Sequence, residues 1–449
     1  MMEPVADRAA VSASASKEIA LLGASVLALT LSGQFVHQRL GSSAFFLLII
    51  LCACGAARAA VLCGRPDRPG ALVIVLVVAA LLRLTMLGAD NYFSSDVFRY
   101  VWDGRVQAAG INPYRFVPAA PDVAFLRDAA IYPHINRADY AVTIYPPGAQ
   151  LIFFLITRLG DSLLVMKAGL VAFDGVSIVA LMAILRKLGH PPAVAVAYAW
   201  HPLPVWEIAA NGHLDAAMVA FIMLGLWAAL AARPLLAGVL VAMAAMVKPI
   251  ALVVLPALWR PWDWRLPAVV MAIAIVTTLP YLGVGLGIFG FWPGYVTEEG
   301  LASGDRYWLL SVLQNLTGPI PGGTVLYLVS ALAVLGGMAL AASFRRDRSP
   351  EAAIAGAAWL IFTFLLLLSP NFPWYFLALA PFLALTRQPA FWAMTTLAFL
   401  LYDVIPDDRV MTLTTRQNLL YGTTLVCLLY SLWIALRRSK QAANGDAPT

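Results

Sequence analysis

The chain has 449 residues, of which 61% are hydrophobic and only 12% are charged, and its net charge is +6. A soluble globular domain carries about 25% charged residues, so this composition excludes that class and favours a protein whose main solvent is lipid. The basic excess forms no stripe in a soluble domain, so it indicates contact with anionic lipid headgroups rather than with nucleic acid.

Apolar runs long enough to cross the roughly 30 Å hydrocarbon core of a bilayer recur along the whole chain. The clearest runs cover residues 18–37, 43–62, 71–88, 166–186, 214–231, 267–283, 323–343, 351–369 and 417–436. Weaker or shorter runs cover residues 146–160, 193–209, 235–258, 373–386 and 390–404. The sequence therefore predicts an all-α, polytopic transmembrane helix bundle of about 12–14 spans. It is expected to form one integral membrane domain over 1–449, with a cytoplasmic tail at 437–449.

The distribution of Lys and Arg sets the expected orientation, because basic loops stay in the cytoplasm. The main basic markers are Arg65, Arg68, Arg260, Arg265, Arg345, Arg346, Arg348, Arg437, Arg438 and Lys440. If all of them are cytoplasmic, both termini lie inside. The polar segments 89–145 and 284–307, and the turn at 369–374, then lie outside.

Two features do not fit this scheme cleanly. Arg186 and Lys187 fall on the wrong side of the membrane. The pair Lys248–Pro249 breaks the run 235–258, which is then either one kinked span or a re-entrant hairpin.

The segment 89–145, here named the first polar loop, stands out by its charged and aromatic residues. Apolar and aromatic residues recur at helical spacing from Asp96 to Ala109, which predicts an amphipathic helix lying in the membrane interface. Ser94–Ser95–Asp96 offers N-cap chemistry for this helix, and Gly110 is expected to end it. The next residues, Asn112–Pro113–Tyr114, predict a turn.

Asp96 is the main candidate for chemistry in this loop. It is either a helix-capping carboxylate or a base, held at the membrane boundary, that removes the proton of a sugar hydroxyl. Asp90 and Asp103 are the competing candidates. Asp103 is expected to pair with Arg99 or Arg105 on its own helix, since these residues lie within one turn of it.

Further along the chain, the cluster Asn211–Asp215 stands at the start of an apolar helix. Asn211 could cap that helix and His213 could be a structural histidine, or His213, Asp215 or Glu207 could line an active site. A lysine inside an apolar span is costly, so Lys248 is expected either to contact a phosphate or to have a structural partner.

Aromatic and acidic residues recur in the later polar segments. Trp374 and Tyr375 could belong to an interfacial aromatic belt or to a sugar or prenyl pocket. In the segment 284–307, here named the second polar loop, and just after it, charged and aromatic residues could bind an acceptor: Glu298, Glu299, Asp305, Arg306, Tyr307 and Trp308.

Two neighbouring segments carry a family resemblance: DVFRYVWDGRVQAAGINPY and IYPPGAQLIFFL. They resemble the first extracytoplasmic loop of the glycosyltransferase C superfamily and, more narrowly, of the bacterial polyprenol-phosphate-mannose-dependent mannosyltransferases. They are more distantly similar to the catalytic subunit of the first GPI-anchor mannosyltransferase, with Asp96, Pro113–Tyr114 and Tyr145–Pro146–Pro147 in the matching places. Three later segments follow in the order of the bacterial family: WHPLPVWEIAANGHLDA, MVKPIALVVLP and LSPNFPWYFLALAPFLAL.

The resemblance implies a glycosyltransferase-C-like fold and inverting transfer of a hexose, expected to be mannose, from a polyprenyl-phosphate sugar. The acceptor would be a glycolipid, a polysaccharide or a protein on the outer face of a bacterial inner membrane. By motif position Asp96 would be the general base. The leaving phosphate needs cationic or hydrogen-bonding partners, for which the candidates are Arg99, Arg105, His213 and Lys248. The other predicted substrate-binding residues are Tyr145, Asp215, Trp374 and Tyr375.

No cofactor and no metal are expected, since the lipid-linked sugar serves as co-substrate. The eukaryotic relative carries an Asp-x-Asp motif, whereas this chain has Ser94 two positions before Asp96. The alternative function is a lipid-linked sugar transporter or flippase. That class places polar groups at mid-membrane on broken helices, for which Lys248–Pro249 is the one good candidate.

Overall fold

The computed structural model describes residues 5–65, 68, 70–91, 93–402 and 411–443, which are mainly helical and contain no strand. Six helical units are long and apolar enough to cross a membrane: Ser16–Cys63 of α1 (Val5–Cys63), α5 (Leu163–Lys187), Arg265–Glu298, α14 (Gly323–Phe344), α15 (Pro350–Leu368) and Leu413–Arg437. The unit Arg265–Glu298 joins α11 (Arg265–Thr278), the 3-10 segment η6 (Leu279–Phe289) and α12 (Trp292–Glu298). The last unit joins α18 (Leu413–Gln417), the π-helical η10 (Asn418–Gly422) and α19 (Thr423–Ala443). The predicted all-α class is confirmed, and these helices are compatible with a multi-pass membrane protein.

Shorter apolar helices fill the rest of the bundle: α2 (Ala71–Leu87), α4 (Pro147–Thr157), α8 (Asp215–Leu230), α9 (Pro234–Val247), η5 (Pro249–Val254) with α10 (Leu255–Leu258), and α17 (Pro389–Leu397) with η9 (Ala398–Leu401). The remaining α-helices are α3 (Asp96–Ala108), α6 (Val196–Ala199), α7 (Pro202–Pro204), α13 (Trp308–Thr317) and α16 (Leu383–Thr386). Short segments of other helix types are η1 (Pro121–Leu126), η2 (Tyr132–His134), η3 (Pro192–Ala195), the π-helical η4 (Val205–Ala210), η7 (Pro373–Ala378) and η8 (Ala380–Phe382).

The strong predicted spans all fall on helices, but several weak ones are broken. Gly41, with φ of 82°, divides α1 into the two predicted runs 18–37 and 43–62. The run 193–209 is cut into four short pieces, and the run 235–258 ends its α-helix at Val247. The described residues therefore contain fewer long helices than the predicted 12–14 spans. The predicted tail at 437–449 continues α19 as far as Ala443, and its last six residues, 444–449, lie outside the described residues.

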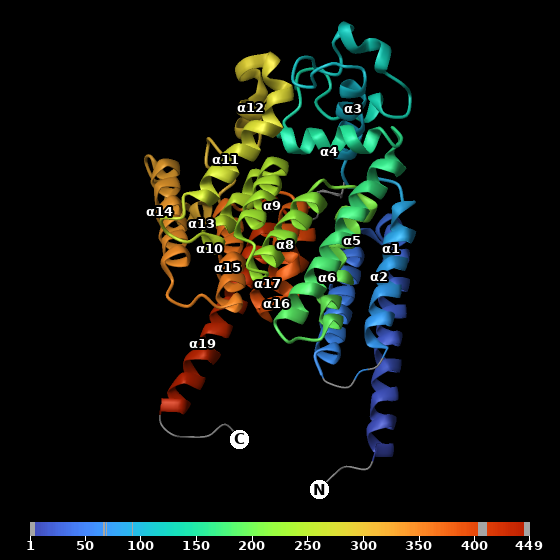
Figure 1. Cartoon of the computed structure of the whole chain (residues 1–449), viewed down its shortest axis with the longest axis vertical. Helices are drawn as coiled ribbons and strands as arrows, with labels where there is room; N and C mark the ends of the chain where they lie inside the picture. The colour runs from blue at the N-terminus through green and yellow to red at the C-terminus, as the bar shows by residue number, and fades with distance from the viewer. Residues whose placement is uncertain (1–4, 66–67, 69, 92, 403–410, 444–449) are drawn as a thin grey trace.

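The loops that were predicted to lie outside gather at one end of the bundle, opposite both chain termini (Figure 1). In that view α3 and α12 stand at the top and α4 lies across the bundle rather than along it. The predicted span at 146–160 is thus a helix that covers this end. Because α4 does not cross, α5 runs back toward the end with the termini, and its last turn carries Arg186 and Lys187. Arg186 and Lys187 therefore lie toward the same end of the bundle as the chain termini, and they no longer conflict with the expected orientation.

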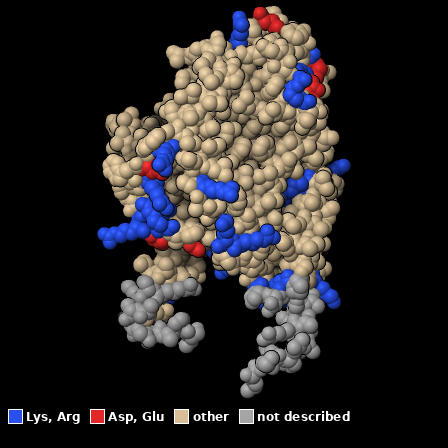
Figure 2. Space-filling model, viewed as in Figure 1, with Lys and Arg blue, Asp and Glu red and all other residues tan. Residues whose placement is uncertain are grey.

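Charged side chains are distributed unevenly along the bundle. On the face seen in Figure 2, Lys and Arg are more numerous in the lower half, nearer the chain termini, than in the upper half. A wide area almost free of charged residues separates the lower group from a smaller, mixed group of charges at the top. This distribution is the one that the positive-inside rule predicts when the termini are cytoplasmic.

Helix α3 is fixed on top of the bundle by close packing against α4. A Cβ atom at Gly104 would lie 2.5 Å from Thr157 Cγ2 and 2.7 Å from the Phe153 carbonyl oxygen, so only glycine permits this approach. Val97 and Val101, which lie on the same helix face as Gly104, are also buried. The helix begins at Asp96 and is followed by Gly110 with φ of 76°, as predicted.

Candidate active site

A cavity of about 340 Å³ opens at the end of the bundle that carries α3 and α12. Its wall combines both polar loops, the turn around 372–375, the start of α8 and the break that follows α9. Segments that were predicted to lie on one side of the membrane therefore meet around one space. The cluster Asn211–Asp215 reaches the same space through Leu214 and Asp215.

Asp96 lies on the cavity wall as the first residue of α3. Its Oδ1 accepts a hydrogen bond of 2.9 Å from Asn136 Nδ2, and its backbone N–H donates to Ser94 Oγ at 3.2 Å. The residue at the N-cap position, Ser95, makes no side-chain capping bond. Among the described residues, no Lys or Arg forms an ion pair with Asp96. The carboxylate is therefore neither a helix cap nor half of a salt bridge.

The surroundings of Asp96 alter its proton affinity. The residue keeps partial access to the cavity, yet the protein excludes enough water around the carboxyl group that burial raises its pKa. Hydrogen bonds from Asn136 and Tyr145 and the charges of Lys248 and Arg137 act in the opposite direction, with smaller effect. A carboxylate that is buried without an ion pair binds a proton more readily than an exposed one, as a general base requires.

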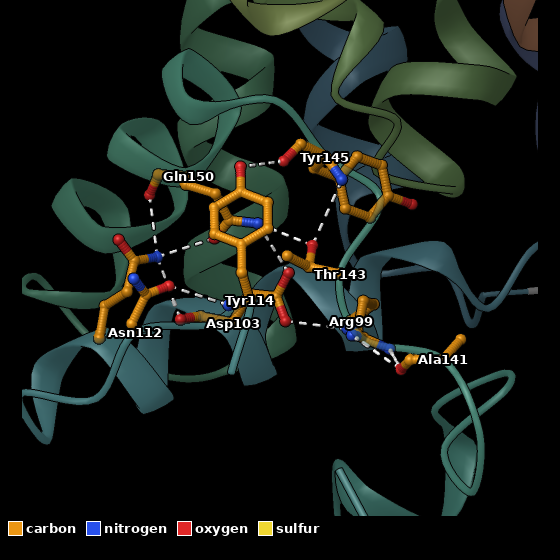
Figure 3. A network of polar contacts seen from close by, with 9 residues as sticks. Arg99, Asp103, Asn112, Tyr114, Ala141, Thr143, Tyr145 and Gln150 are labelled. Atoms are coloured by element: carbon orange, nitrogen blue, oxygen red, sulfur yellow. Dashed lines mark hydrogen bonds and ion pairs between the residues drawn. The ribbon is translucent and has the colours of Figure 1, made fainter. Parts of the chain in front are cut away.

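Asp103, on the same helix, is bound in a closed polar network (Figure 3). Arg99 Nε donates to Asp103 Oδ1 at 2.8 Å, and the same guanidinium donates to the Ala141 carbonyl at 3.1 Å. Gln150 Nε2 donates to Asp103 Oδ2 at 2.9 Å and to Thr143 Oγ1 at 2.8 Å. The predicted pairing of Asp103 with Arg99 is confirmed. Arg99 lies on the cavity wall, but its charge is already partnered.

Arg105 lies away from the cavity wall. Its guanidinium forms ion pairs with Asp128 at 2.8 Å and with Asp161 at 3.1 Å, and donates to the Leu126 carbonyl. Tyr145, by contrast, is on the wall, where its ring packs edge-on against Tyr100 with centroids 5.0 Å apart. Tyr145 and Asp96 thus line the same cavity, whereas Arg105 is not part of the cavity wall.

Lys248 reaches the cavity because the helix breaks at its position. Its backbone is extended (φ −151°, ψ 120°), and Pro249 starts a new 3-10 turn. The ammonium group lies 2.8 Å from Asp215 Oδ1 and 3.9 Å from the centroid of the Tyr375 ring. Asp215 is the first residue of α8, where the helix dipole favours a negative charge. The side chain of Lys248 is 21% exposed and the residue lines the cavity, so the ion pair leaves the side chain partly accessible.

His213 is fully buried behind the wall rather than on it. Its ring stacks on Trp374 with centroids 4.1 Å apart, and its Nε2 lies 3.3 Å from Glu207 Oε2. Trp374 and Tyr375 both line the cavity. The histidine therefore supports an aromatic wall residue.

Asn211 does not cap α8, whose N-cap residue is Leu214 and makes no side-chain capping bond. Instead its Oδ1 accepts from the Phe93 N–H at 3.3 Å, and its carbonyl accepts from Asn91 Nδ2 at 2.9 Å. Asn211 thereby holds the segment that leads directly to Asp96.

Several wall residues carried no signal in the sequence. Asn136, the hydrogen-bond partner of Asp96, lies in an irregular part of the first polar loop where no periodicity marks it. Arg137 follows it with φ of 55° and forms an ion pair of 2.6 Å with Glu298, which joins the two polar loops. Trp292 and Tyr295 of α12 also line the cavity. An acid–aromatic composition was the one feature that pointed to the second loop.

Three carboxylate residues line the cavity: Asp96, Asp215 and Glu299. Asp215 pairs with Lys248, and Glu299 Oε2 lies 3.2 Å from Arg306 Nη1. Asp96 is the wall carboxylate that lacks a cationic partner among the described residues. Within the same residues, no group of three or more His, Cys, Asp and Glu is placed to hold a metal ion. The arrangement can accept a proton from a hydroxyl group bound in the cavity.

Comparison with known proteins gives one clear relationship. No curated protein and no solved structure matches the chain. Residues 9–263, more than half of the chain, match the MptA_B family, described as alpha-(1->6)-mannopyranosyltransferase, N-terminal domain. The matched region contains Asp96, Asp215 and Lys248, whereas Glu299 and Trp374 lie beyond it. The match agrees with the resemblance carried by the first polar loop, and the chain belongs to this family of mannosyltransferases.

Proposed function

We propose that this protein transfers a mannosyl group from a polyprenyl-phosphate sugar to a hydroxyl group of a glycolipid or polysaccharide, with inversion at the anomeric carbon. The observation that carries the proposal is the position of Asp96: a carboxylate that forms no ion pair with any described Lys or Arg, on the wall of a cavity that Lys248 also lines. The family match supports mannosyl transfer as the general activity. The choice of a polyprenyl-phosphate donor rests on the resemblance of the first polar loop, not on the family match.

In the proposed reaction the acceptor oxygen attacks the anomeric carbon while its proton passes to the carboxylate of Asp96. The bond between the anomeric carbon and the phosphate oxygen breaks, and polyprenyl phosphate leaves with the electron pair of that bond. One displacement inverts the configuration. The raised pKa of Asp96 suits this role, because a stronger base removes a hydroxyl proton more effectively.

Lys248 is assigned to the leaving phosphate. As the donor bond breaks, negative charge builds up on the phosphate, and a nearby cation stabilises it. Lys248 is the wall cation at the end of a broken helix, and its ammonium group remains accessible from the cavity. Arg99 is bound on several sides by Asp103 and Ala141, so it is a weaker candidate.

A panel of donors tests this proposal directly. The purified protein in lipid is offered polyprenyl-phosphate mannose, polyprenyl-phosphate glucose and a soluble nucleotide mannose, together with an alkyl α-mannopyranoside as acceptor. The expected result is consumption of polyprenyl-phosphate mannose alone, with polyprenyl phosphate and an extended glycoside as products. Consumption of the nucleotide sugar instead would contradict the proposed donor class.

The same preparation distinguishes transfer from transport. The transporter alternative rests on the break at Lys248–Pro249, which here brings the lysine to a wall that it shares with Asp96. In sealed vesicles, an enzyme consumes donor only when acceptor is present on the side of its cavity. A flippase would move the lipid-linked sugar across the bilayer without consuming it.

The cavity is assigned to the outer face of a bacterial inner membrane, and single cysteines test that assignment. In a cysteine-free background, Asp122→Cys at the exposed first loop should react with an impermeant thiol reagent in intact cells. Arg346→Cys, between α14 and α15, should react only after lysis. The reverse pattern would place the cavity in the cytoplasm.

A further inference from the structure

The cavity has a second charged corner that the proposed reaction does not use. Glu299 lies on the wall with only 6% of its side chain exposed, and Arg306 holds its Oε2 at 3.2 Å. Arg306 is itself 1% exposed, lies off the wall, and donates from Nε to the Leu368 carbonyl at 3.3 Å. Arg306, which lies off the wall, therefore fixes the carboxylate of a residue that lines the cavity.

The neighbouring acids of the same loop point elsewhere. Glu298 is engaged by Arg137 and by the Tyr140 hydroxyl, and Asp305 accepts a hydrogen bond of 2.7 Å from Ser303. Of the acids predicted to bind an acceptor, Glu299 is the one on the wall. The structure thus selects one candidate from a group that the sequence could not separate.

Two aromatic rings lie on the same side of the cavity as Glu299. Trp292 and Tyr295 stack with centroids 5.9 Å apart and planes inclined by 23°, and both line the wall. Trp292, Tyr295 and Glu299 follow one another at spacings of three and four residues along α12 and its C-cap, so they share one helix face. Trp292 keeps 49% of its surface exposed although it is a large aromatic residue. A ring of this size left open to a cavity is free to stack on a ligand.

This face suits a neutral sugar and not a phosphate. Sugar hydroxyl groups donate to carboxylates in short, charge-assisted hydrogen bonds, and the apolar face of a pyranose ring packs on aromatic rings. A phosphate would be repelled by Glu299, whereas Lys248 offers it a cation on another part of the wall. The charge of the wall therefore favours the neutral acceptor sugar near Glu299 and the donor phosphate near Lys248.

We propose that the α12 face formed by Trp292, Tyr295 and Glu299 binds the pyranose ring that carries the attacking hydroxyl group. This inference rests on the proposed function and assigns the acceptor side of the same cavity. It makes Glu299 a residue that determines acceptor specificity, and it leaves the donor phosphate to Lys248.

The experiment measures acceptor binding and transfer separately in the full chain in lipid. An alkyl α-mannopyranoside is titrated by calorimetry into wild type, Glu299→Gln, Trp292→Ala and Trp292→Phe. The expected result is a dissociation constant about ten- to hundred-fold weaker for Glu299→Gln and Trp292→Ala, since a hydrogen bond to a charged group is lost or a stacking surface is removed. Trp292→Phe should recover part of the binding. With polyprenyl-phosphate mannose, the acceptor KM should rise by the same factor while the donor KM stays within about two-fold.

Asp305→Asn is the matched control, because it removes an exposed carboxylate of the same loop that faces Ser303 rather than the cavity. It should bind the alkyl mannoside as wild type does. Trp292→Ala keeps the Glu299–Arg306 pair intact, so it tests the face even if Glu299→Gln folds poorly. The inference is overturned if wild type does not bind the alkyl mannoside, if both variants bind it normally, or if the donor KM rises instead. If the variants lose binding but wild type transfers no sugar, the binding site stands and the proposed function fails.

Discussion

Helix α3 carries two carboxylates in contrasting environments. Asp103 is 1% exposed and its charge is satisfied by Arg99, with Gln150 on its second oxygen. Asp96, about two turns earlier, has a neutral partner in Asn136 and faces a cavity. The two residues share a helix and a residue type. They differ in ion pairing: Arg99 pairs with Asp103, whereas no described Lys or Arg pairs with Asp96.

This difference separates a structural acid from a candidate base. The carboxylate of Asp103 has its negative charge balanced by Arg99 in a buried ion pair, which holds the helix in place. A carboxylate buried without a cation is destabilised as an anion, so burial raises the pKa of Asp96 and strengthens it as a proton acceptor. The presence of an acid near the membrane surface is therefore a weaker sign of function than the absence of its salt bridge. Five experiments test this contrast.

The largest effect is expected for Asp96→Asn. The amide keeps the size of the side chain but cannot take the acceptor proton, so the rate of sugar transfer should fall by about 10²–10⁴-fold. Expression, thermal unfolding and donor binding should stay close to wild type. Transfer at near-normal rate in this variant would reject Asp96 as the base and direct attention to Asp90.

Lys248→Met should have the next largest effect. It keeps an unbranched apolar chain but removes the charge opposite the leaving phosphate, which is worth about 1.5–3 kcal/mol, or one to two decades in kcat/KM for the donor. Lys248→Arg should recover part of the loss, limited by the planar shape of its guanidinium. Because the substitution also unpairs Asp215, the double variant with Asp215→Asn is the control. If the double variant works at the wild-type rate, Lys248 serves only to pair with Asp215.

The pH dependence of transfer should report the raised pKa of Asp96. The base works in its deprotonated form, so kcat/KM should fall about tenfold per pH unit below that pKa. Since burial raises the value, this acid limb should lie above the ordinary aspartate pKa of 3.8. Asn136→Ala removes a hydrogen bond that stabilises the anion, so it should move the limb to still higher pH. A limb that stays in place in Asn136→Ala would argue that another group controls the profile.

Asp103→Asn should act on stability more than on chemistry. Leaving Arg99 buried without its partner costs about 3–5 kcal/mol in comparable buried pairs, so the midpoint of thermal unfolding should fall clearly. The kcat of the protein that remains folded should change by only a few fold. A loss of kcat as large as that of Asp96→Asn, at unchanged stability, would reverse the roles given to the two acids.

The smallest effect is expected for Arg105→Gln. Its partners Asp128 and Asp161 are partly exposed, at 39% and 61%, and such pairs contribute about 0–1 kcal/mol. Because Arg105 is off the cavity wall, the donor KM should stay within about two-fold of wild type. A tenfold rise in the donor KM would bring Arg105 back as a phosphate-binding residue.

Much of the helical framework could be read from local pattern. Apolar runs marked the helices, Gly110 marked the end of α3, and Pro249 marked the break after α9. These features depend on the periodicity of a few neighbouring residues or on the backbone restrictions of Gly and Pro, which are present in the sequence itself. The weak run at 146–160 shows the limit of such patterns. Its hydrophobicity predicts an apolar helix, but not that α4 lies across the bundle instead of through it.

The sequence by itself determined that Asp96 and Lys248 were unusual, because charged residues beside or within apolar runs are costly. Only the tertiary structure decided which acid meets which cation. Arg99 and Arg105 are both within one turn of Asp103, yet Arg99 pairs with it and Arg105 turns to Asp128 and Asp161. The partners of Asp96 and Lys248 lie 40 and 33 residues away in the chain, on other elements. Pairing of this kind depends on how helices pack and where their side chains point, and local spacing does not contain that information.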